Sequence, residues 1–122
     1  MTLFQMSKYR PKKHGNETCK CSSGHIHDSR GESKYCDRLR YEQMNGYIRS
    51  YEIQKKFVLT VEGERICTHI VDFLVTDNKG KVSAHEYKGM PTATWRLKMK
   101  LFKRCYPDIP YLVKNKMDIV GL

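Results

Sequence analysis

The sequence predicts an α/β protein in which one helix, three strands, a second helix and a fourth strand follow one another. Two segments combine helix-capping residues with spaced apolar residues, around 29–45 and 92–105. Between them lie three stretches rich in β-branched and aromatic residues, separated by turn sequences. A short apolar run at 111–113 follows the second helix and predicts the last strand.

The first helix is predicted from about Ser29 to Asn45. Ser29 and Glu32 have the spacing of a capping box, in which the serine caps the first turn and the glutamate reaches back to it. Gly46 is a suitable stop signal. Its apolar residues, Tyr35 among them, form only a rough stripe, so the helix is predicted from its ends more than from its periodicity.

Turn sequences divide the middle of the chain into three predicted strands: 48–61, 66–76 and 82–88. The first strand is expected to bend near 54–56, where Gln-Lys-Lys interrupts the apolar pattern. The second helix is expected to begin at Thr92 or Thr94, because threonine can cap a helix. It ends before Pro107, which cannot continue a helix.

Length and charge restrict the class of protein. The chain has 122 residues, enough for one domain with a modest core, and a net charge of +10 that favours polyanionic partners. No apolar run approaches the roughly 18 residues of a membrane span, so no membrane partner is expected. The first six residues do not resemble a signal peptide. A cytoplasmic location is therefore expected, with reduced cysteines.

Three regions are predicted. Residues 1–28 form a basic arm and a Cys/His loop, in which no regular element is expected. Residues 29–113 form the core, and residues 114–122 form a C-terminal tail.

A group of charged residues on the second and third predicted strands suggests metal chemistry. Asp72 lies within an otherwise apolar run, and Glu86 and Lys88 lie two positions apart. Side chains alternate across a strand, so Glu86 and Lys88 share one face and Tyr87 takes the other. Two carboxylates bind a hard divalent cation, and a lysine can position a water molecule. The alternative is that these residues form an exposed polar strand face.

A second candidate site is rich in cysteine and histidine. Cys19, Cys21, His25 and His27 lie within nine residues, and Cys36 follows on the first helix. Two thiolates and two imidazoles are a tetrahedral ligand set for Zn²⁺. The set that replaces Cys19 with Cys36 is better spread in sequence, and Cys36 lies one helical turn after Glu32. The alternative is a basic loop with free thiols.

Seven short motifs occur in order between residues 8 and 113. They are Lys8-Tyr9-Arg10, Asp28-Ser29-x-x-Glu32, Gly46-Tyr47-Ile48, Gln54-x-x-Phe57, Val71-Asp72-Phe73, Glu86-Tyr87-Lys88-Gly89, and Lys98-x-Lys100-Leu101-Phe102 before Tyr106-Pro107. In this order the chain resembles the PD-(D/E)xK nuclease superfamily. Within it, the chain resembles a phage and prophage family described only as a domain of unknown function. Val71 replaces the proline of the superfamily name, and the signature does not require the Cys/His cluster.

The resemblance implies a restriction-endonuclease-like αβββαβ core with a mixed central sheet flanked by helices. It implies that Asp72 and Glu86 hold one or two Mg²⁺ or Mn²⁺ ions, with the Tyr87 carbonyl completing the shell. Lys88 would hold the attacking water.

Two further residues receive roles from the resemblance. Glu32, on the first helix, would be a ligand or a water-mediated ligand, although the capping box also explains it. Gln54, on the first strand, would be an accessory polar group of the catalytic site, and a solvent-facing strand glutamine is the alternative.

The implied function is a divalent-metal-dependent DNA endonuclease, phage-encoded and acting in the bacterial host cytoplasm on branched or double-stranded DNA such as a Holliday junction. A homodimer would place one site at each symmetric cleavage point of a junction. Two basic segments would contact phosphates, unless they are solvated faces: Lys8, Arg10, Lys12 and Lys13, and Arg96, Lys98, Lys100 and Lys103.

Two other functions are weighed against this one. A non-catalytic, zinc-stabilised DNA-binding protein would use the Cys/His loop and the basic helix. A zinc-containing HNH-type nuclease needs a histidine base on a ββα element, and no histidine lies at a suitable position.

Overall fold

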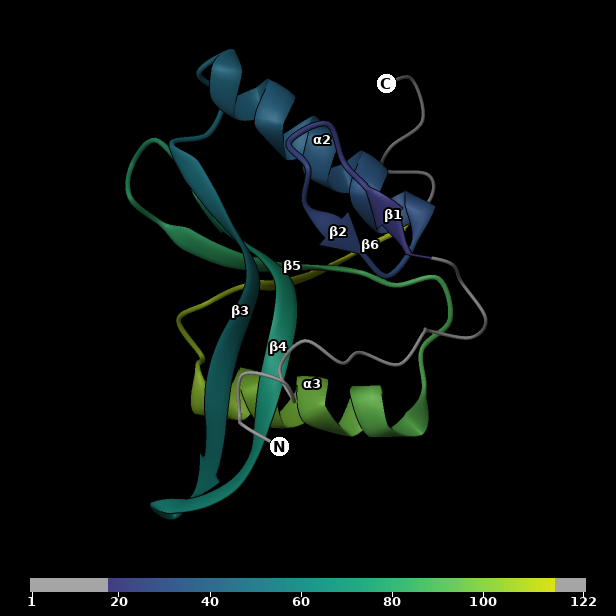
Figure 1. The fold of residues 1–122 in the computed structure, drawn as a ribbon. Helices are drawn as coiled ribbons and strands as arrows, with labels where there is room; N and C mark the ends of the chain where they lie inside the picture. Colours follow the sequence, from purple (N-terminus) through teal and green to yellow (C-terminus); the bar gives the residue numbers. More distant parts are fainter. Residues whose placement is uncertain (1–17, 116–122) are drawn as a thin grey trace, which may run out of the picture.

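The computed structural model describes residues 18–115. Its elements, in chain order, are β1 Cys19–Lys20, β2 Ile26–His27, α2 Arg30–Met44, β3 Ser50–Val61, β4 Glu64–Thr76, β5 Val82–Tyr87, α3 Ala93–Cys105 and β6 Tyr111–Lys114 (Figure 1). The predicted α/β order is confirmed from α2 onward. The basic residues expected in the N-terminal arm, Lys8 to Lys13, lie outside the described residues. Within the described range, no helix is both long and apolar enough to cross a membrane.

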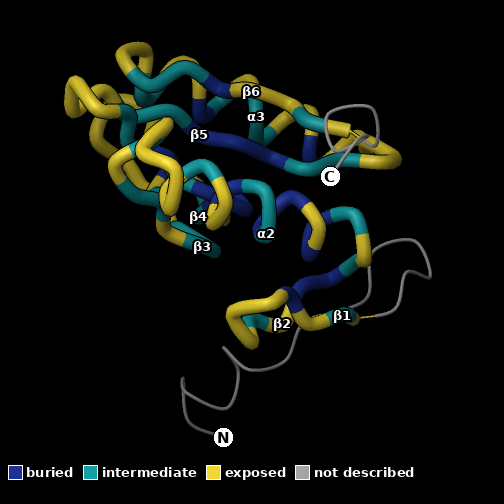
Figure 2. Tube along the Cα trace, turned by 90° about the horizontal axis from the view of Figure 1, so that it is seen from above, coloured by how far each residue is buried: buried dark blue, intermediate teal, exposed yellow. Residues whose placement is uncertain are grey.

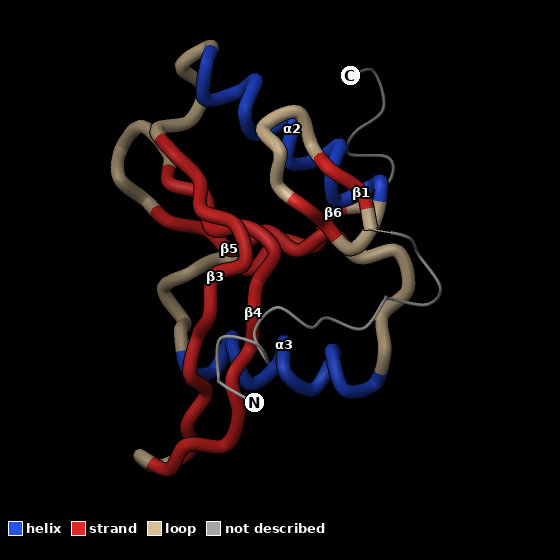
Figure 3. The backbone as a smooth tube through the Cα atoms, viewed as in Figure 1, coloured by secondary structure: helices blue, strands red, loops and turns tan. Residues whose placement is uncertain are grey.

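The sheet contains four strands in the order β3-β4-β5-β6. β3 and β4 are antiparallel, β4 and β5 are antiparallel, and β5 and β6 are parallel, so the expected mixed sheet is confirmed. Helix α3 provides the crossover to the parallel strand, as such a connection requires. Figure 3 shows α2 and α3 at different heights along the long strands β3 and β4, which run past both helices.

The hydrophobic core consists of two clusters, and each helix packs on one of them. Tyr35 and Leu39 of α2 pack with Phe73, whereas Trp95 and Phe102 of α3 pack in a second core. Leu59, Val71, Ala84 and Tyr111 complete the α3 core. Figure 2 shows buried residues gathered on β4, on β5 and on the first half of α2.

The long β3–β4 hairpin changes face in its middle. Ile53 packs in the α2 core and Phe57 in the α3 core, although a regular strand would keep both on one face. Gln54 lies between them with a φ of 53°, and the register passes from Ile53↔Phe73 to Lys55↔Val71 without pairing Gln54 with Asp72. The bend predicted near residue 54 is confirmed, and it lets one hairpin serve two helices.

The expectation of no regular element before residue 29 was wrong. β1 and β2 form a small antiparallel hairpin, closed by a hydrogen bond from Cys21 N to His25 O of 3.0 Å. Gly24 makes the turn possible, because its φ of 87° lies in the left-handed region that favours glycine. Strands of two residues are too short to show a periodic pattern.

The tip of the β3–β4 hairpin is tighter than predicted. Glu62 and Gly63 both have positive φ, 50° and 82°, which is the backbone of a two-residue type I′ turn. Glu64, expected in the turn, is the first residue of β4.

Candidate active site and Cys/His cluster

Asp72 and Glu86 face each other where the pairing of β4 with β5 stops. The last residues that pair through their backbones are Phe73 and His85. At the next position, hydrogen bonds between a side chain and a backbone amide take the place of backbone pairing. The amide of Asp72 donates to Glu86 Oε2 at 2.9 Å, and the amide of Tyr87 donates to Asp72 Oδ2 at 2.9 Å. Both carboxylates are buried, with 2% and 3% of their surfaces exposed. The structure therefore brings together the two acidic residues that the strand pattern indicated.

Glu86 and Lys88 lie on the side of the sheet that α3 covers. Lys88 Nζ is 5.3 Å from the centre of the Trp95 ring, a cation–π contact. Burial raises the pKa of Tyr111, and the charges of Glu86 and Asp72 raise it further, so this tyrosine lies beside both carboxylates. The predicted strand alternation is observed.

Tyr87 points the other way, into the α2 core. A Cβ added at Gly31 would collide with the Tyr87 ring, so any larger residue there would displace this ring where the first turn of α2 meets β5.

Glu32 is connected to β3 by its side chain. The N-cap prediction is confirmed, since Ser29 Oγ accepts from the Glu32 amide at 3.1 Å. The Glu32 carboxylate is wholly buried, and its Oε2 accepts from His27 Nδ1 at 2.9 Å and from Gln54 Nε2 at 3.1 Å. Side-chain contacts therefore run from His27 through Glu32 to Gln54, the residue of β3 that stands opposite Asp72 in the register of β3 and β4.

Four Cys and His side chains converge beside α2. The ligand atoms of Cys21, His25, His27 and Cys36 all lie within 4.8 Å of one another, so the cluster could hold a structural zinc. Cys36 Sγ and His25 Nδ1 are 3.5 Å apart. Cys19 is not part of this group, and its thiol lies 3.7 Å from the Lys20 carbonyl oxygen.

Interactions within this cluster change the pKa values of Cys21, His27 and Cys36. Burial alone would lower the pKa of His27, but interactions with Cys36, Glu32 and Cys21 raise it to about 10. Burial alone would raise the pKa of the Cys21 thiol, but hydrogen bonds with His27 and with nearby backbone groups lower it. Burial raises the pKa of Cys36. The lowered pKa of Cys21 makes its thiolate, the form that binds metal, easier to reach than in a free cysteine.

Two buried histidines were given no role by sequence reasoning. His85 Nδ1 lies 2.5 Å from Tyr35 Oη, and His85 Nε2 lies 2.9 Å from Ser83 Oγ. Burial, with a smaller effect of the Lys114 charge, lowers the pKa of His85 to about 4, so this ring is neutral at pH 7. His69 Nε2 lies 2.9 Å from Tyr111 Oη. No local motif marks the contacts with Tyr35 and Tyr111, because each joins residues about 40 or more positions apart.

The basic residues of α3 are only partly available to a ligand. Arg96, Lys100 and Lys103 are exposed. Lys98 is half-buried, and its Nζ donates to the Thr68 carbonyl at 3.4 Å.

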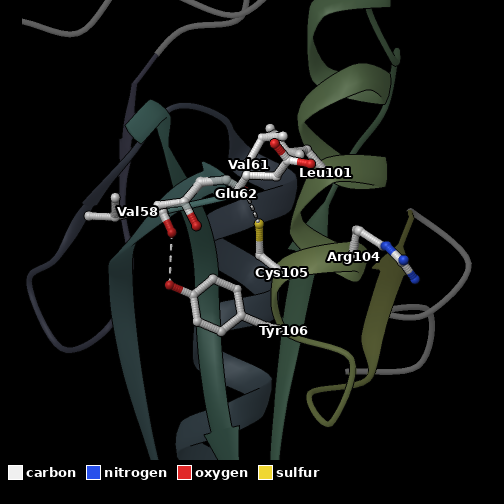
Figure 4. Close-up of a pocket in the computed structure, with 8 residues that line it drawn as sticks. Val58, Val61, Glu62, Leu101, Arg104, Cys105 and Tyr106 are labelled. Atoms are coloured by element: carbon white, nitrogen blue, oxygen red, sulfur yellow. Dashed lines mark hydrogen bonds between the residues drawn. The ribbon is translucent and has the colours of Figure 1, made fainter. Parts of the chain in front are cut away.

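A pocket of about 550 Å³ lies between the tip of the β3–β4 hairpin and the end of α3 (Figure 4). Tyr106 Oη donates to the Val58 carbonyl at 2.8 Å, and the Cys105 thiol donates to the Thr60 carbonyl at 3.2 Å. None of its lining residues belongs to the carboxylate group or to the Cys/His cluster. The hydrogen bonds of Tyr106 and Cys105 hold the end of α3 against β3.

The chain belongs to the family described as "Protein of unknown function (DUF1064)", which matches residues 6–117. No curated protein and no solved structure matches the chain. The membership agrees with the expected domain of unknown function, whereas the resemblance to PD-(D/E)xK nucleases rests on the motifs alone.

Proposed function

We propose that the chain is a divalent-metal-dependent endodeoxyribonuclease of the PD-(D/E)xK type. The observation that carries the proposal is the pair of buried carboxylates, Asp72 and Glu86, beside Lys88 at the end of the β4–β5 ladder. Buried charges are costly unless they are paired, and two adjacent carboxylates repel each other. A cation that both residues bind would remove this repulsion, and carboxylate oxygens are suitable ligands for Mg²⁺ or Mn²⁺.

In the proposed mechanism, Asp72, Glu86 and the Tyr87 carbonyl would hold the cation. The bound cation would polarise the scissile phosphate and lower the pKa of a coordinated water. Lys88 extends from the same strand face as Glu86 and contacts Trp95. Its ammonium group would hold the attacking water and offset negative charge that develops on the phosphate.

Glu32 and Gln54 take supporting roles in this proposal. A water-mediated contact between Glu32 and the cation would keep both hydrogen bonds that Oε2 of Glu32 makes, with His27 and with Gln54. Gln54 stands opposite Asp72 at the face change, so it can position the strand that carries this ligand.

The substrate class follows from charge. The net charge of +10 and the exposed lysines of α3 suit a polyanion. Branched DNA, such as a Holliday junction cleaved by a homodimer, is the substrate that the family resemblance suggests.

Cleavage assays test the proposal. The chain is incubated with linear, nicked, flap and four-way DNA in Mg²⁺, in Mn²⁺ and in EDTA. We expect cleavage only with a divalent cation, because the proposed mechanism needs the cation to polarise the phosphate and to activate the water. Undiminished cleavage in EDTA would contradict it. Binding without cleavage in every metal would favour the second candidate, a non-catalytic zinc-stabilised DNA-binding protein, which the Cys/His cluster supports.

DNA binding should weaken steeply with salt, because lysines that neutralise phosphates release counterions. Lys100→Ala combined with Lys103→Ala should reduce the slope of log K against log salt by about 0.9 for each phosphate that the variant no longer neutralises. Lys79→Ala with Lys81→Ala, on the exposed β4–β5 turn, is the matched control. Fluorescence anisotropy over a salt series measures both slopes. Equal slopes for the two double variants would contradict a DNA-binding role of α3.

A further inference from the structure

His27 has a buried nitrogen that is unsatisfied. Its ring is fully buried, and Nε2 has no hydrogen-bond partner among residues 18–115. Nδ1 faces the carboxylate of Glu32 at 2.9 Å and must therefore carry a proton. When a metal ion takes the place of the Nε2 proton, Nε2 presents its lone pair to the cluster. A buried polar nitrogen without a hydrogen-bond partner is costly, so its position needs an explanation.

The arrangement of the four side chains fits one tetrahedral ion. Zn–N bonds of about 2.0 Å and Zn–S bonds of about 2.3 Å place neighbouring ligand atoms about 3.3–3.8 Å apart. Cys36 Sγ and His25 Nδ1 are already 3.5 Å apart, and all four ligand atoms lie within 4.8 Å of one another. A metal could therefore bind with small side-chain adjustments.

The backbone that carries the ligands is held before any metal binds. The β1–β2 turn places Cys21 next to His25. Two contacts fasten the hairpin to α2: the amide of Ser22 donates to Asp37 Oδ1 at 2.7 Å, and Ser33 Oγ donates to the Cys19 carbonyl at 2.9 Å. Cys36, the fourth ligand, lies on the same stretch of α2.

We propose that Cys21, His25, His27 and Cys36 bind one structural Zn²⁺, and that Glu32 orients His27 as its outer-sphere carboxylate. Two thiolates and two imidazoles suit Zn²⁺ and not the harder Mg²⁺. A two-iron cluster would need the ligands divided between two ions. The four ligand atoms here all lie within 4.8 Å of one another, which suits a single ion. A histidine that binds a metal usually donates its other N–H to a carboxylate, as His27 does.

The same carboxylate connects the zinc site to β3. Glu32 Oε2 also accepts from Gln54 Nε2 at 3.1 Å, and Gln54 is the residue at which the hairpin changes face. Zinc binding would thus fix the conformation of Gln54, opposite Asp72. This consequence rests on the proposed function, whereas zinc binding itself does not.

Metal content is the first test. The full chain, purified without chelator, should contain about one Zn²⁺ per chain by elemental analysis, as expected for one four-ligand site. Cys21→Ser and Cys36→Ser should lose the ion and lower the Tm by about 10 °C or more, because binding and folding are coupled. Cys19→Ser is the matched control in the same hairpin and should keep both properties. Asp72→Asn should also keep its zinc, which separates failure of this proposal from failure of the nuclease assignment.

Zinc affinity tests the role of Glu32. Chelator competition should show that Glu32→Gln binds zinc about 10–100-fold more weakly. Glu42→Gln, on the same helix and paired with Arg38, should bind like wild type. A zinc-free protein whose Cys21→Ser variant melts like wild type would overturn the site. A Cys21–Cys36 disulfide, detected by mass, would also overturn it. An unchanged affinity in Glu32→Gln would overturn the outer-sphere role alone.

Discussion

Asp72→Asn and Glu86→Gln should each lower metal-dependent DNA cleavage by at least about 10²-fold, the scale expected when one electrostatic contact to a transition state is removed. Each substitution removes a negative ligand but keeps an oxygen that can accept the observed backbone hydrogen bond, from the Tyr87 amide or from the Asp72 amide. The fold should therefore survive. Lys88→Ala should reduce cleavage to a comparable extent without affecting the two carboxylates.

Single-turnover cleavage of labelled DNA, with thermal unfolding and DNA binding measured alongside, checks this prediction. Glu52→Gln is the matched control, because Glu52 is an exposed strand carboxylate whose ion pair is with Lys55. We expect it to cleave like wild type. If the Asp72 and Glu86 variants retain full activity, the carboxylate pair is structural.

Phe102→Ala should be the most destabilising single substitution discussed. The Phe102 ring is fully buried, and the rings of Phe57, Tyr106 and Tyr111 have centroids 4.9, 5.2 and 5.2 Å away. Truncating a buried phenylalanine costs about 3–5 kcal/mol. At about 4 °C per kcal/mol, the value between those of smaller and larger domains, we expect the Tm to fall by about 12–20 °C.

Thermal unfolding by circular dichroism measures the effect. Leu97→Ala in the same helix is the control, because 68% of the Leu97 surface is exposed. It should change the free energy of unfolding by less than about 0.5 kcal/mol. Similar melting temperatures for the two variants would mean that α3 does not form the core described.

Local rules predicted much of the fold. Ser29 caps α2 and the chain bends at Gln54, and both were expected from a few neighbouring residues. The opposite orientations of Glu86 and Tyr87 followed from strand alternation alone. The set of four Cys and His residues was also expected, because three of its members belong to one short loop and the fourth is one turn along the adjacent helix from Glu32.

Contacts between distant elements were not predicted. The Glu32 side chain was expected to complete a capping box or to serve as a ligand of the catalytic metal. The contacts of its Oε2 with His27 and Gln54 were not foreseen, and they arise because a fully buried carboxylate needs strong donors. The pairing of His85 with Tyr35 joins residues 50 positions apart, and no sequence pattern encodes it.

The sequence by itself determined the order of the elements from α2 to β6, the opposite orientations of Glu86 and Tyr87 on β5, and the family to which the chain belongs. These properties depend on capping, periodicity and turn chemistry, which act within a few residues. Only the tertiary structure decided that β3 and β4 change face at Gln54 and that the Asp72 and Glu86 carboxylates accept backbone hydrogen bonds from the opposite strand. Such contacts arise when buried polar groups on separate elements find partners, and that choice depends on how the whole chain packs.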